Sequence, residues 1–329
     1  MGAVRTSHPR FKREGQPARI ELTDDDIAIL RHVYRHRFVR ADDLYRLFPN
    51  RSPDKLSRRL VRLYRNQFLD RPIAQVDRFH EGGSQPLVYG LYTAGARFLK
   101  ETFDVPLTSI DWKARNRSYT RDNLDHTLAI AHFMIGLELA IRARPNMALL
   151  SFEDILADAP ERTQRQVQPG KWPVELRWLG TRGVVQIAPD AIFGIRTEDG
   201  TKTTRTYIFL EMDRGTMTIA PAKQVRESDA FLYRATILRK FVAFAESYRQ
   251  DLHKSHLGIS ATRTLFITTT KARAEAMRQA AEEYVVGPRQ LPAGLFLFCV
   301  PGTENPLSTK VVDTFGQPTY LIRPTTSER

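Results

Sequence analysis

Three carboxylates in the second half of the chain have the types and spacing of a metal site. Asp190 lies on the apolar run 184–195, and Glu211 and Asp213 end the next apolar run. Both runs are rich in β-branched and aromatic residues, which predicts two neighbouring buried strands joined by the polar loop 196–205. Acids at the ends of buried strands need a metal, hydrogen bonds or an opposite charge to offset the loss of water. Three oxygen ligands from adjacent strands suit a hard cation such as Mg²⁺ or Mn²⁺, so we predict that these acids bind one.

The charge balance points to a polyanionic partner. The chain of 329 residues has 50 Lys and Arg against 37 Asp and Glu, a net charge of +13, and a pI near 10. A surplus of this size favours nucleic acid as a partner. The alternative is a generally basic protein whose arginines only cover its surface. Residues 1–20 are basic and are predicted to be a disordered arm.

Residues 21–103 have the pattern of a winged helix-turn-helix. Thr23 is a good N-cap for a first helix. Three acids follow it in the first turn, where the helix dipole favours negative charge. A second helix is predicted over 40–48 and a third over 53–68. The predicted strands 71–79 and 86–92 then form a hairpin with its tip at 80–85, and a helix over 93–100 closes the domain.

The third helix of this domain is predicted to enter the major groove of double-stranded DNA. Between Arg51 and Arg78 the chain has eight Lys and Arg against three Asp, so phosphate contacts would dominate the affinity. The alternatives are a winged helix that contacts protein, or a basic helix that is merely solvated. The predicted DNA contacts are Lys55, Arg58, Arg59, Arg62, Arg65 and Arg78.

The rest of the chain is predicted to be a polar linker at 104–122, an α/β (α+β) domain with a mixed sheet at 123–300, and a turn-rich tail at 301–329. The domain begins with a long apolar helix, and the two acidic strands lie near the middle of the domain. The other elements predicted in it are a loop over 153–172, an edge strand over 174–178 and a long helix over 228–248.

Length and composition narrow the class of protein further. The chain is long enough for two domains, and the single Cys299 excludes an internal disulfide and a cysteine-based zinc site. No apolar run is expected to approach the roughly 18 residues of a membrane span. No apolar stretch follows the basic N-terminus, so we expect neither a signal peptide nor a membrane anchor. The default expectation is a cytoplasmic protein, with a homodimer as one possible assembly.

The chain resembles the bacterial replication-relaxation family of plasmids and other mobile elements, and its second domain resembles the PD-(D/E)xK nuclease fold. The resemblance covers about 22–270. The residues that carry it are Tyr89-Gly-Leu-Tyr-Thr-Ala-Gly95, His126, Pro189-Asp190, Glu211-Met-Asp-Arg-Gly-Thr216 and Lys240-Phe-Val-Ala-Phe244.

The nuclease resemblance implies that Asp190 and Glu211 hold the metal, which would polarise the scissile phosphate and help to generate hydroxide. The lysine that normally follows the glutamate by two residues is absent, because Asp213 occupies that position. Either Lys240 on the next helix reaches the same space, or Asp213 is an extra metal ligand. Other candidates for the basic group are Lys223, Arg239 and Arg234, and for a further acid Glu138 and Glu153.

Two readings without chemistry stay open. Asp190 could be a turn residue, and Glu211 and Asp213 could pair with Arg214, Arg234 or Arg239, which would leave a degenerate nuclease core as a scaffold. The protein would then be a DNA-binding regulator or an accessory factor of replication or mobilisation. A protein-interaction module with an acidic partner is the second alternative.

Overall fold

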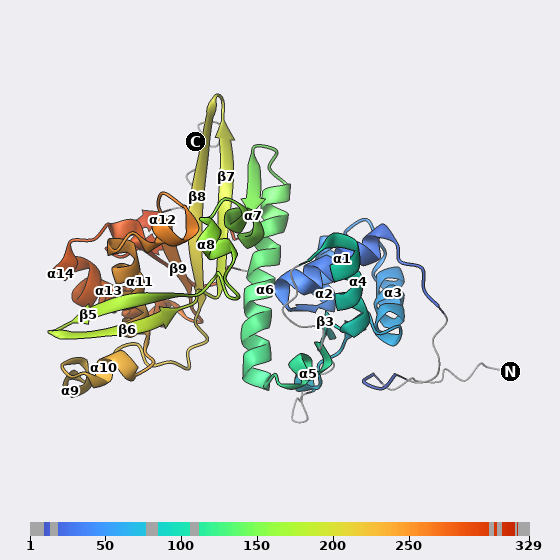
Figure 1. The fold of residues 1–329 in the computed structure, drawn as a ribbon, viewed down its shortest axis with the longest axis horizontal. Coiled ribbons are helices and arrows are strands. Elements are labelled where there is room, and N and C mark those ends of the chain that lie inside the picture. The colour runs from blue at the N-terminus through green and yellow to red at the C-terminus, as the bar shows by residue number, and fades with distance from the viewer. Residues whose placement is uncertain are drawn as a thin grey trace. The chain divides into compact units, whose positions relative to one another are not determined.

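The structure is a computed structural model that describes residues 10–13, 19–76, 85–105, 112–302, 306–307, 311–319 and 321. The chain divides into two compact units, Met1–Ile135 and Gly136–Arg329. Helix α6 (Arg121–Arg142) begins in the first unit and ends in the second (Figure 1). The mixed α/β class that was predicted from the sequence is confirmed.

The first unit contains helices around a three-stranded antiparallel sheet with the order β1-β3-β2. Its elements are α1 (Asp24–His36), β1 (Phe38–Arg40), α2 (Ala41–Leu47), α3 (Pro53–Arg65), β2 (Leu69–Asp70), the 3₁₀ turn η1 (Ile73–Gln75), β3 (Val88–Leu91), α4 (Thr93–Phe103) and α5 (Trp112–Arg117).

Local signals begin the helices of this unit as the sequence predicts. Thr23 forms a capping box with Asp26 at the start of α1, and the Ser52 hydroxyl accepts from the Lys55 amide at the start of α3. The apolar face of α3 is buried, with Leu60 and Leu63 fully inaccessible to solvent. The first half of α6 packs through its leucines on β1 and β3.

The predicted strand over 71–79 is wrong for residues 71–76, and residues 77–79, like residues 80–84 of the predicted hairpin tip, lie outside the described residues. Strand β2 ends at Asp70, because Pro72 has no N–H to donate to a ladder and the chain turns into η1. The side chain of Gln75 replaces the missing ladder bonds. Its amide nitrogen donates to the Val88 carbonyl at 3.0 Å, and its amide oxygen accepts from the Val88 amide at 2.8 Å.

Two further expectations for the first unit need correction. Part of the predicted disordered arm is attached to this unit, since Arg13 donates to the Leu69 carbonyl and the Asp70 carboxylate and lies over the rings of Tyr64 and Tyr92. Residues 1–9 and 14–18 of the arm lie outside the described residues. The predicted linker at 104–122 contains α5, which buries a tryptophan.

The second unit is built on a seven-stranded mixed sheet with the order β12-β11-β10-β9-β8-β7-β4, and a separate hairpin of β5 and β6. Its strands are β4 (Met147–Leu150), β5 (Trp172–Trp178), β6 (Thr181–Ile187), β7 (Ala191–Asp199), β8 (Lys202–Met212), β9 (Arg263–Ile267), β10 (Phe296–Cys299), β11 (Val311–Asp313) and β12 (Pro318–Thr319). Strands β8, β9 and β10 are parallel to one another, and the other neighbours are antiparallel.

The helices of this unit join and cover the parallel strands. They are α7 (Phe152–Ala157), α8 (Glu161–Gln164), α9 (Lys223–Arg226), α10 (Ala230–Tyr233), α11 (Ile237–Arg249), α12 (Leu252–Leu257), α13 (Lys271–Ala281), the π-helical turn η2 (Glu282–Val286), α14 (Gly287–Arg289) and the 3₁₀ turn η3 (Ala293–Leu295). Helices α9 to α12 lie between β8 and β9 in the chain, and α13, η2, α14 and η3 lie between β9 and β10.

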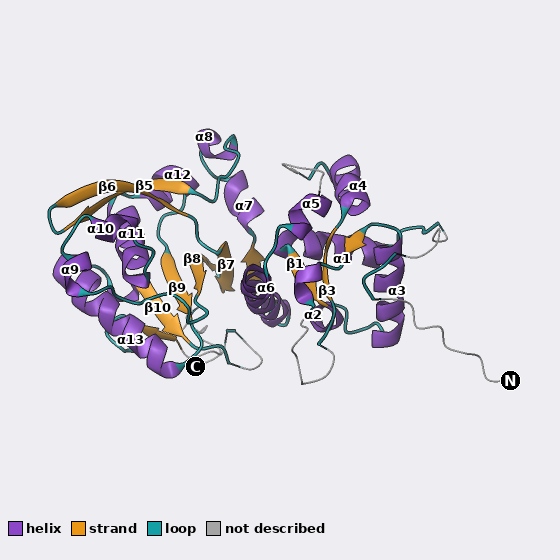
Figure 2. Ribbon diagram, turned by 90° about the horizontal axis from the view of Figure 1, so that it is seen from below, coloured by secondary structure: helices purple, strands orange, loops and turns teal. Residues whose placement is uncertain are grey.

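Helix α11 lies between the central strands and the β5–β6 hairpin (Figure 2). Phe241 contacts Phe266 of β9 at a ring distance of 4.7 Å, and Phe244 contacts Phe209 of β8 at 6.2 Å. On the other side of the helix, Trp172 of β5 donates to the Ser247 hydroxyl at 3.1 Å. The core of the unit is therefore centred on α11. Its packing positions the side chains of α11 that face β8.

Several elements of the second unit differ from the prediction. The run 184–195 is two strands, because Pro189 interrupts it and sends β6 and β7 into different sheets. The predicted loop 196–205 is a long ladder that turns at Gly200, which has a φ of +59°. The β7–β8 hairpin consequently projects beyond β9 (Figure 1), since β8 pairs with β9 only from Ile208 onward.

Four more corrections concern elements further from the acids. The predicted loop 153–172 contains α7 and α8, and the predicted edge strand 174–178 belongs to the β5–β6 hairpin. The predicted helix 228–248 is broken between α10 and α11, where Thr236 caps the second helix. The predicted tail at 301–329 contributes β11 and β12 to the sheet.

Helix α6 also differs from the expectation that no apolar run reaches the length of a membrane span. By length and composition alone this helix is long and apolar enough to cross a membrane. One such helix is weak support for a span, because the core helix of a soluble protein has the same composition.

Candidate functional site

The structure brings Asp190 and Glu211 next to each other at the end of a strand pair. Ala191 of β7 pairs with Leu210 of β8, so the next pair along the ladder is Asp190 with Glu211. The Asp190 amide donates to the Leu210 carbonyl at 2.9 Å. In return, the Met212 amide donates to the Asp190 carboxylate at 2.8 Å. The two acids are thus held by backbone hydrogen bonds on adjacent strands.

Both acids face the side of the sheet that α11 covers. Ile192 and Phe209 are direct cross-strand partners, and both belong to the core around α11. Asp190 and Glu211 each lie two residues from this pair, and alternate residues of a strand share a face. Glu211 is only 3% exposed, so its charge requires a nearby compensating group.

Lys240 supplies that group from the first turn of α11. Its ammonium donates to Glu211 Oε2, and the lysine side chain is 35% exposed, whereas that of Glu211 is 4% exposed. Burial by itself would lower the pKa of Lys240, but the charges of Glu211, Asp190 and Asp213 raise it above its usual value. The lysine therefore stays protonated, and its side chain is partly exposed to solvent beside the buried Glu211.

Asp213 has different surroundings although it follows Glu211 by only two residues. Arg273 of α13 donates to both of its oxygens, at 2.6 and 2.9 Å, and the Thr268 hydroxyl donates at 2.5 Å. Burial would raise the pKa of Asp213, but these hydrogen bonds and the arginine charge lower it. Both oxygens are occupied, which disfavours Asp213 as a metal ligand.

Sequence reasoning missed Arg273 and Thr268 as partners of Asp213. It assigned the structural pairing of the acids to Arg214, Arg234 or Arg239 instead. No spacing rule points to Arg273, because it comes 60 residues after Asp213, beyond the four helices α9 to α12 and strand β9. The parallel pairing of β8 with β9 is what brings the two together.

Three of the five other candidates for the basic group and the extra acid have partners of their own. Arg239 donates to the Leu232 carbonyl at 3.0 Å, and Lys223 lies 3.9 Å from Glu227. Glu138 accepts from Arg142 one turn later in α6 at 2.5 Å. Glu153 is an exposed residue in the first turn of α7. Of the lysines and arginines proposed for the missing motif position, Lys240 is the one whose ammonium contacts Glu211.

The predicted DNA contacts divide into two groups. Lys55, Arg58, Arg62 and Arg65 recur at intervals of three, four and three residues on α3, which places them along one helical face; the first three are exposed and Arg65 is half-buried. Arg59 is turned away from this stripe.

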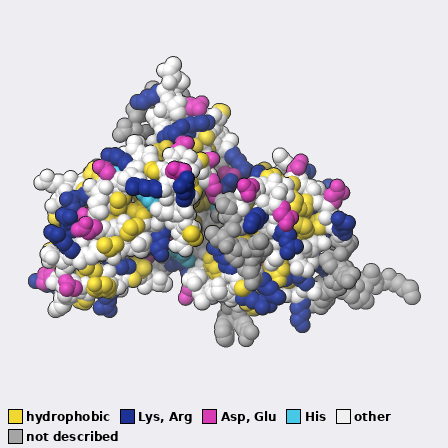
Figure 3. Space-filling model, in the orientation of Figure 1, with side chains coloured by type: hydrophobic (Ala, Val, Ile, Leu, Met, Phe, Trp, Pro, Cys, Tyr) yellow, Lys and Arg dark blue, Asp and Glu magenta, His cyan; other side chains and the backbone are white. Residues whose placement is uncertain are grey.

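Arg59 binds the fully buried carboxylate of Asp26 and donates to the Glu21 carbonyl at 2.6 Å. It therefore holds α3 against α1. Arg78 lies outside the described residues. Elsewhere, Lys and Arg side chains are spread over the visible face of both units (Figure 3).

Comparison with known protein families gives one result. The sequence model of the replication-relaxation family matches residues 30–231, which is more than half of the chain. No curated protein and no solved structure matches the chain. The matched segment contains the cationic stripe of α3, Asp190 and the Glu211–Asp213 strand end, and it stops before Lys240 and Arg273. The chain belongs to the replication-relaxation family.

Proposed function

We propose that this protein binds double-stranded DNA through its first unit and cleaves or nicks DNA at the Asp190–Glu211–Lys240 site, in the replication or relaxation of plasmid or mobile-element DNA. The observation that carries the chemical part is the contact of Lys240 with Glu211 beside Asp190. Two carboxylates at the ends of neighbouring strands can hold a metal ion, and a lysine beside them can stabilise negative charge on a phosphate. Phosphodiester cleavage needs groups of these kinds.

The order of elements in the first unit supports a winged helix. A helix, a strand, two helices, a β-hairpin and a further helix follow one another, and the first strand joins the hairpin in one sheet. In such domains the third helix lies in the major groove, which is α3 here. The stripe of Lys55, Arg58, Arg62 and Arg65 then faces the phosphates, and its affinity would depend strongly on salt.

The pair of Asp190 and Glu211 fits a magnesium or manganese ion. Mg²⁺ is commonly bound through one or two carboxylates together with waters and substrate phosphates. Asp190 and Glu211 supply two such carboxylates, while Asp213 is occupied by Arg273. When bound, the ion would polarise the scissile phosphate and lower the pKa of a bound water.

The chain's own residues have distinct parts in this proposal. Hydrolysis adds a water oxygen to phosphorus and breaks one P–O ester bond, which leaves a hydroxyl end and a phosphate monoester end. The protonated Lys240 stabilises the negative charge that develops on the phosphate. The Met212 amide orients the Asp190 carboxylate, and Asp213 with Arg273 holds the end of β8 against α13.

Plasmid nicking in Mg²⁺ or Mn²⁺ tests the proposal. The parent should convert supercoiled plasmid to open circles, and Asp190→Ala or Glu211→Gln should slow this by at least about 100-fold. Glu198→Gln, at an exposed position of the β7–β8 hairpin, is the matched control and should cut as the parent does. If the parent and Asp190→Ala are equally inactive on supercoiled, linear and single-stranded DNA, the site has no nuclease activity.

A non-catalytic DNA-binding factor is the second candidate function. The observation that favours it is that Lys240 already compensates the charge of Glu211, as in a structural ion pair. A protein of this kind would retain DNA with a salt-sensitive affinity, and Asp190→Ala would not change that affinity. Failure to retain DNA at low salt would oppose both candidates and favour an acidic protein partner.

A further inference from the structure

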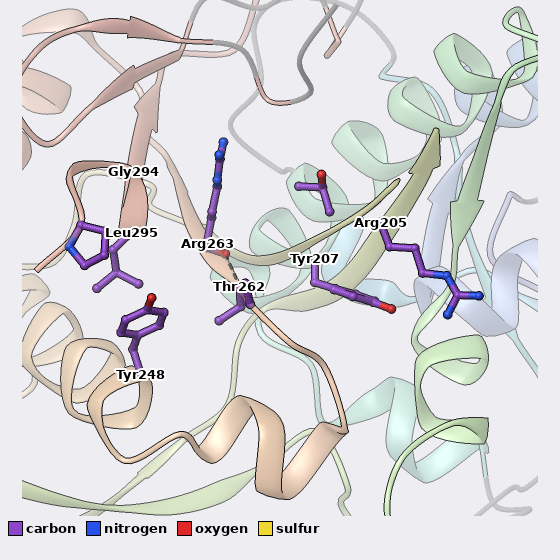
Figure 4. A pocket seen from close by; sticks show the side chains of 10 residues that line it. Arg205, Tyr207, Tyr248, Thr262, Arg263, Gly294 and Leu295 are labelled. Carbon is purple, nitrogen blue, oxygen red and sulfur yellow. Dashed lines mark hydrogen bonds between the residues drawn. The ribbon is translucent and has the colours of Figure 1, made fainter. Parts of the chain in front are cut away.

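A second candidate binding site lies at the opposite end of β8 from the acids. A cavity of about 390 Å³ opens where β8 first meets β9, and its walls come from β8, the end of α11 and the segments before β9 and β10. Six of its lining residues carry the argument: Arg205, Tyr207, Tyr248, Thr262, Arg263 and Gly294 (Figure 4). Arg205 and Glu211 are six positions apart on β8, a distance of roughly 20 Å.

The lining of this cavity combines positive charge with aromatic surface. It contains two arginines and two tyrosines, and the described residues that line it include no Asp or Glu. Its volume lies within the range of about 300–1,000 Å³ for small-molecule sites. In Figure 4 the rings of Tyr207 and Tyr248 lie on either side of Thr262, and Arg263 rises from the start of β9. An anion that also carries a flat ring suits such a lining.

Both tyrosine rings are held in place by the fold. A Cβ at Gly194 of β7 would lie only 3.0 Å from the Tyr207 ring, so this ring rests directly on the backbone of the neighbouring strand. Tyr248 stacks on the buried His253, with ring centres 5.3 Å apart and planes within 6°. Rings fixed in this way lose little conformational freedom when a flat ligand stacks on them.

An independent observation indicates that an anion belongs near Arg205. This residue is the direct cross-strand partner of Arg196, and like charges placed opposite each other destabilise a strand pair. The acids near them are weak partners, because Asp158 lies 3.7 Å from Arg205, Glu198 lies 3.5 Å from Arg196, and all four side chains are well exposed. A bound phosphate would relieve the repulsion between the two arginines.

We propose that this cavity binds a nucleotide, with the base against Tyr207 and Tyr248 and the phosphate on Arg205, which shares one face of β8 with Tyr207. The ligand is either a free nucleotide or an unstacked nucleotide of single-stranded DNA, which share this chemistry. Base stacking on aromatic side chains tolerates any base, so no strict base preference is expected. The inference does not require that the acid site cuts DNA.

Gly294 offers a direct way to block the cavity. A Cβ at this position would meet only Arg263 Nε, at 4.0 Å, and the backbone of Gly294 does not have a left-handed φ. Because Gly294 lines the cavity, a leucine side chain placed here takes up space at the cavity wall without straining the chain. Arg205→Ala is the second variant, and it should fold normally because the Arg205 side chain is half exposed.

The test is calorimetric titration of the full chain with thymidine monophosphate, thymidine, inorganic phosphate and a thymidine trinucleotide. We expect the monophosphate to bind about tenfold more tightly than thymidine or phosphate alone. Gly294→Leu should weaken this binding at least tenfold, and Arg205→Ala about fivefold. Tighter binding of the trinucleotide would identify single-stranded DNA as the source, and equal binding would identify a free nucleotide.

Two controls separate this site from the others. Asp190→Ala and Arg62→Ala should bind the monophosphate as the parent does, because they alter the acid pair and the α3 stripe. The proposal is overturned if Gly294→Leu and Arg205→Ala bind as the parent does, or if phosphate binds as tightly as the nucleotide. Loss of nicking in Asp190→Ala with nucleotide binding intact would separate failure of one proposal from failure of the other.

Discussion

Glu211 and Asp213 lie two residues apart at the end of β8, but different kinds of side chain bind their carboxylates. Asp213 receives two hydrogen bonds from one planar guanidinium and a third from a hydroxyl. Glu211 accepts from the ammonium of Lys240, which ends a flexible side chain, and lies beside a second carboxylate. A bidentate arginine pair is rigid and saturated, whereas a lysine can exchange its partner for a phosphate or a metal-bound water. The difference makes Asp213 a structural acid, and it supports our proposal that Glu211 is the acid used for chemistry.

The first unit repeats this division on α3. Arg59 is committed to the buried Asp26, as Arg273 is to Asp213. Arg62, one turn away, is exposed on the cationic stripe. A count of basic residues in the sequence cannot separate these two arginines, because they differ only in which helix face they occupy.

The largest effect is expected from Arg273→Met. The Asp213 side chain is 4% exposed, so loss of its partner leaves a buried unpaired charge and should lower the free energy of unfolding by about 3–5 kcal/mol. Urea denaturation measures this change. Arg273→Lys should recover only part of it, because an ammonium cannot bind both oxygens in the same geometry. A loss below about 1 kcal/mol would show that Asp213 and Arg273 are not a structural pair.

Lys240→Met should reduce activity strongly and stability only modestly, in contrast to Arg273→Met. We expect nicking to fall about 100-fold. The free energy of unfolding should fall by about 1–2 kcal/mol, less than in Arg273→Met, because Lys240 makes one contact with Glu211 whereas Arg273 donates to both oxygens of Asp213. The double variant Glu211→Gln with Lys240→Met should regain most of this stability and remain inactive. If instead the double variant is as unstable as Arg273→Met, the Glu211 pair is structural after all.

Arg62→Ala and Arg59→Ala form a matched pair for the stripe on α3. Arg62→Ala should weaken retention of duplex DNA several-fold and reduce the slope of log affinity against log salt by about one, while stability stays unchanged. Arg59→Ala should mainly lower stability, because it leaves Asp26 without its guanidinium. Filter binding over a salt series, with thermal melts in parallel, measures both. Equal salt slopes for Arg62→Ala and the parent would exclude this face as a DNA contact.

The smallest effect is expected from mild acid. The folded-state pKa of Asp213 lies below its usual value, because the Arg273 and Thr268 hydrogen bonds outweigh the effect of burial. The stability that this group contributes is therefore fully present above its unfolded pKa of about 4, and is lost as pH falls through the folded pKa. Urea midpoints between pH 6 and pH 2 should show this loss in the parent. The slope should be shallower in Arg273→Met, and an identical slope would contradict the assignment.

Much of the fold follows from local sequence signals. Thr23 and Ser52 begin their helices where the caps predict, because a capping hydroxyl acts within three residues. The apolar side of α3 and the buried strands β9 and β10 follow from periodicity and β-branched composition. The prediction that Asp190 and Glu211 lie on adjacent strands also depended only on short-range pattern.

Other elements depended on local features that were given too little weight. Pro189 marks the break between β6 and β7, and Pro72 marks the end of β2, because neither residue can donate to a ladder. Thr236 is a cap that starts a new helix within the predicted helix 228–248. Proline and capping residues were present in the sequence as signals for these boundaries.

The sequence by itself determined which residues are acidic, basic or apolar along each element, and hence which strands carry the acids and which helix carries the cations. Only the tertiary structure decided their partners: Lys240 with Glu211, Arg273 with Asp213, and Arg59 with Asp26. The physical reason is that a contact between residues 29, 33 or 60 positions apart depends on how strands and helices pack. That packing is determined by hydrophobic burial, which is non-directional and involves the whole core, so short-range sequence patterns do not specify it.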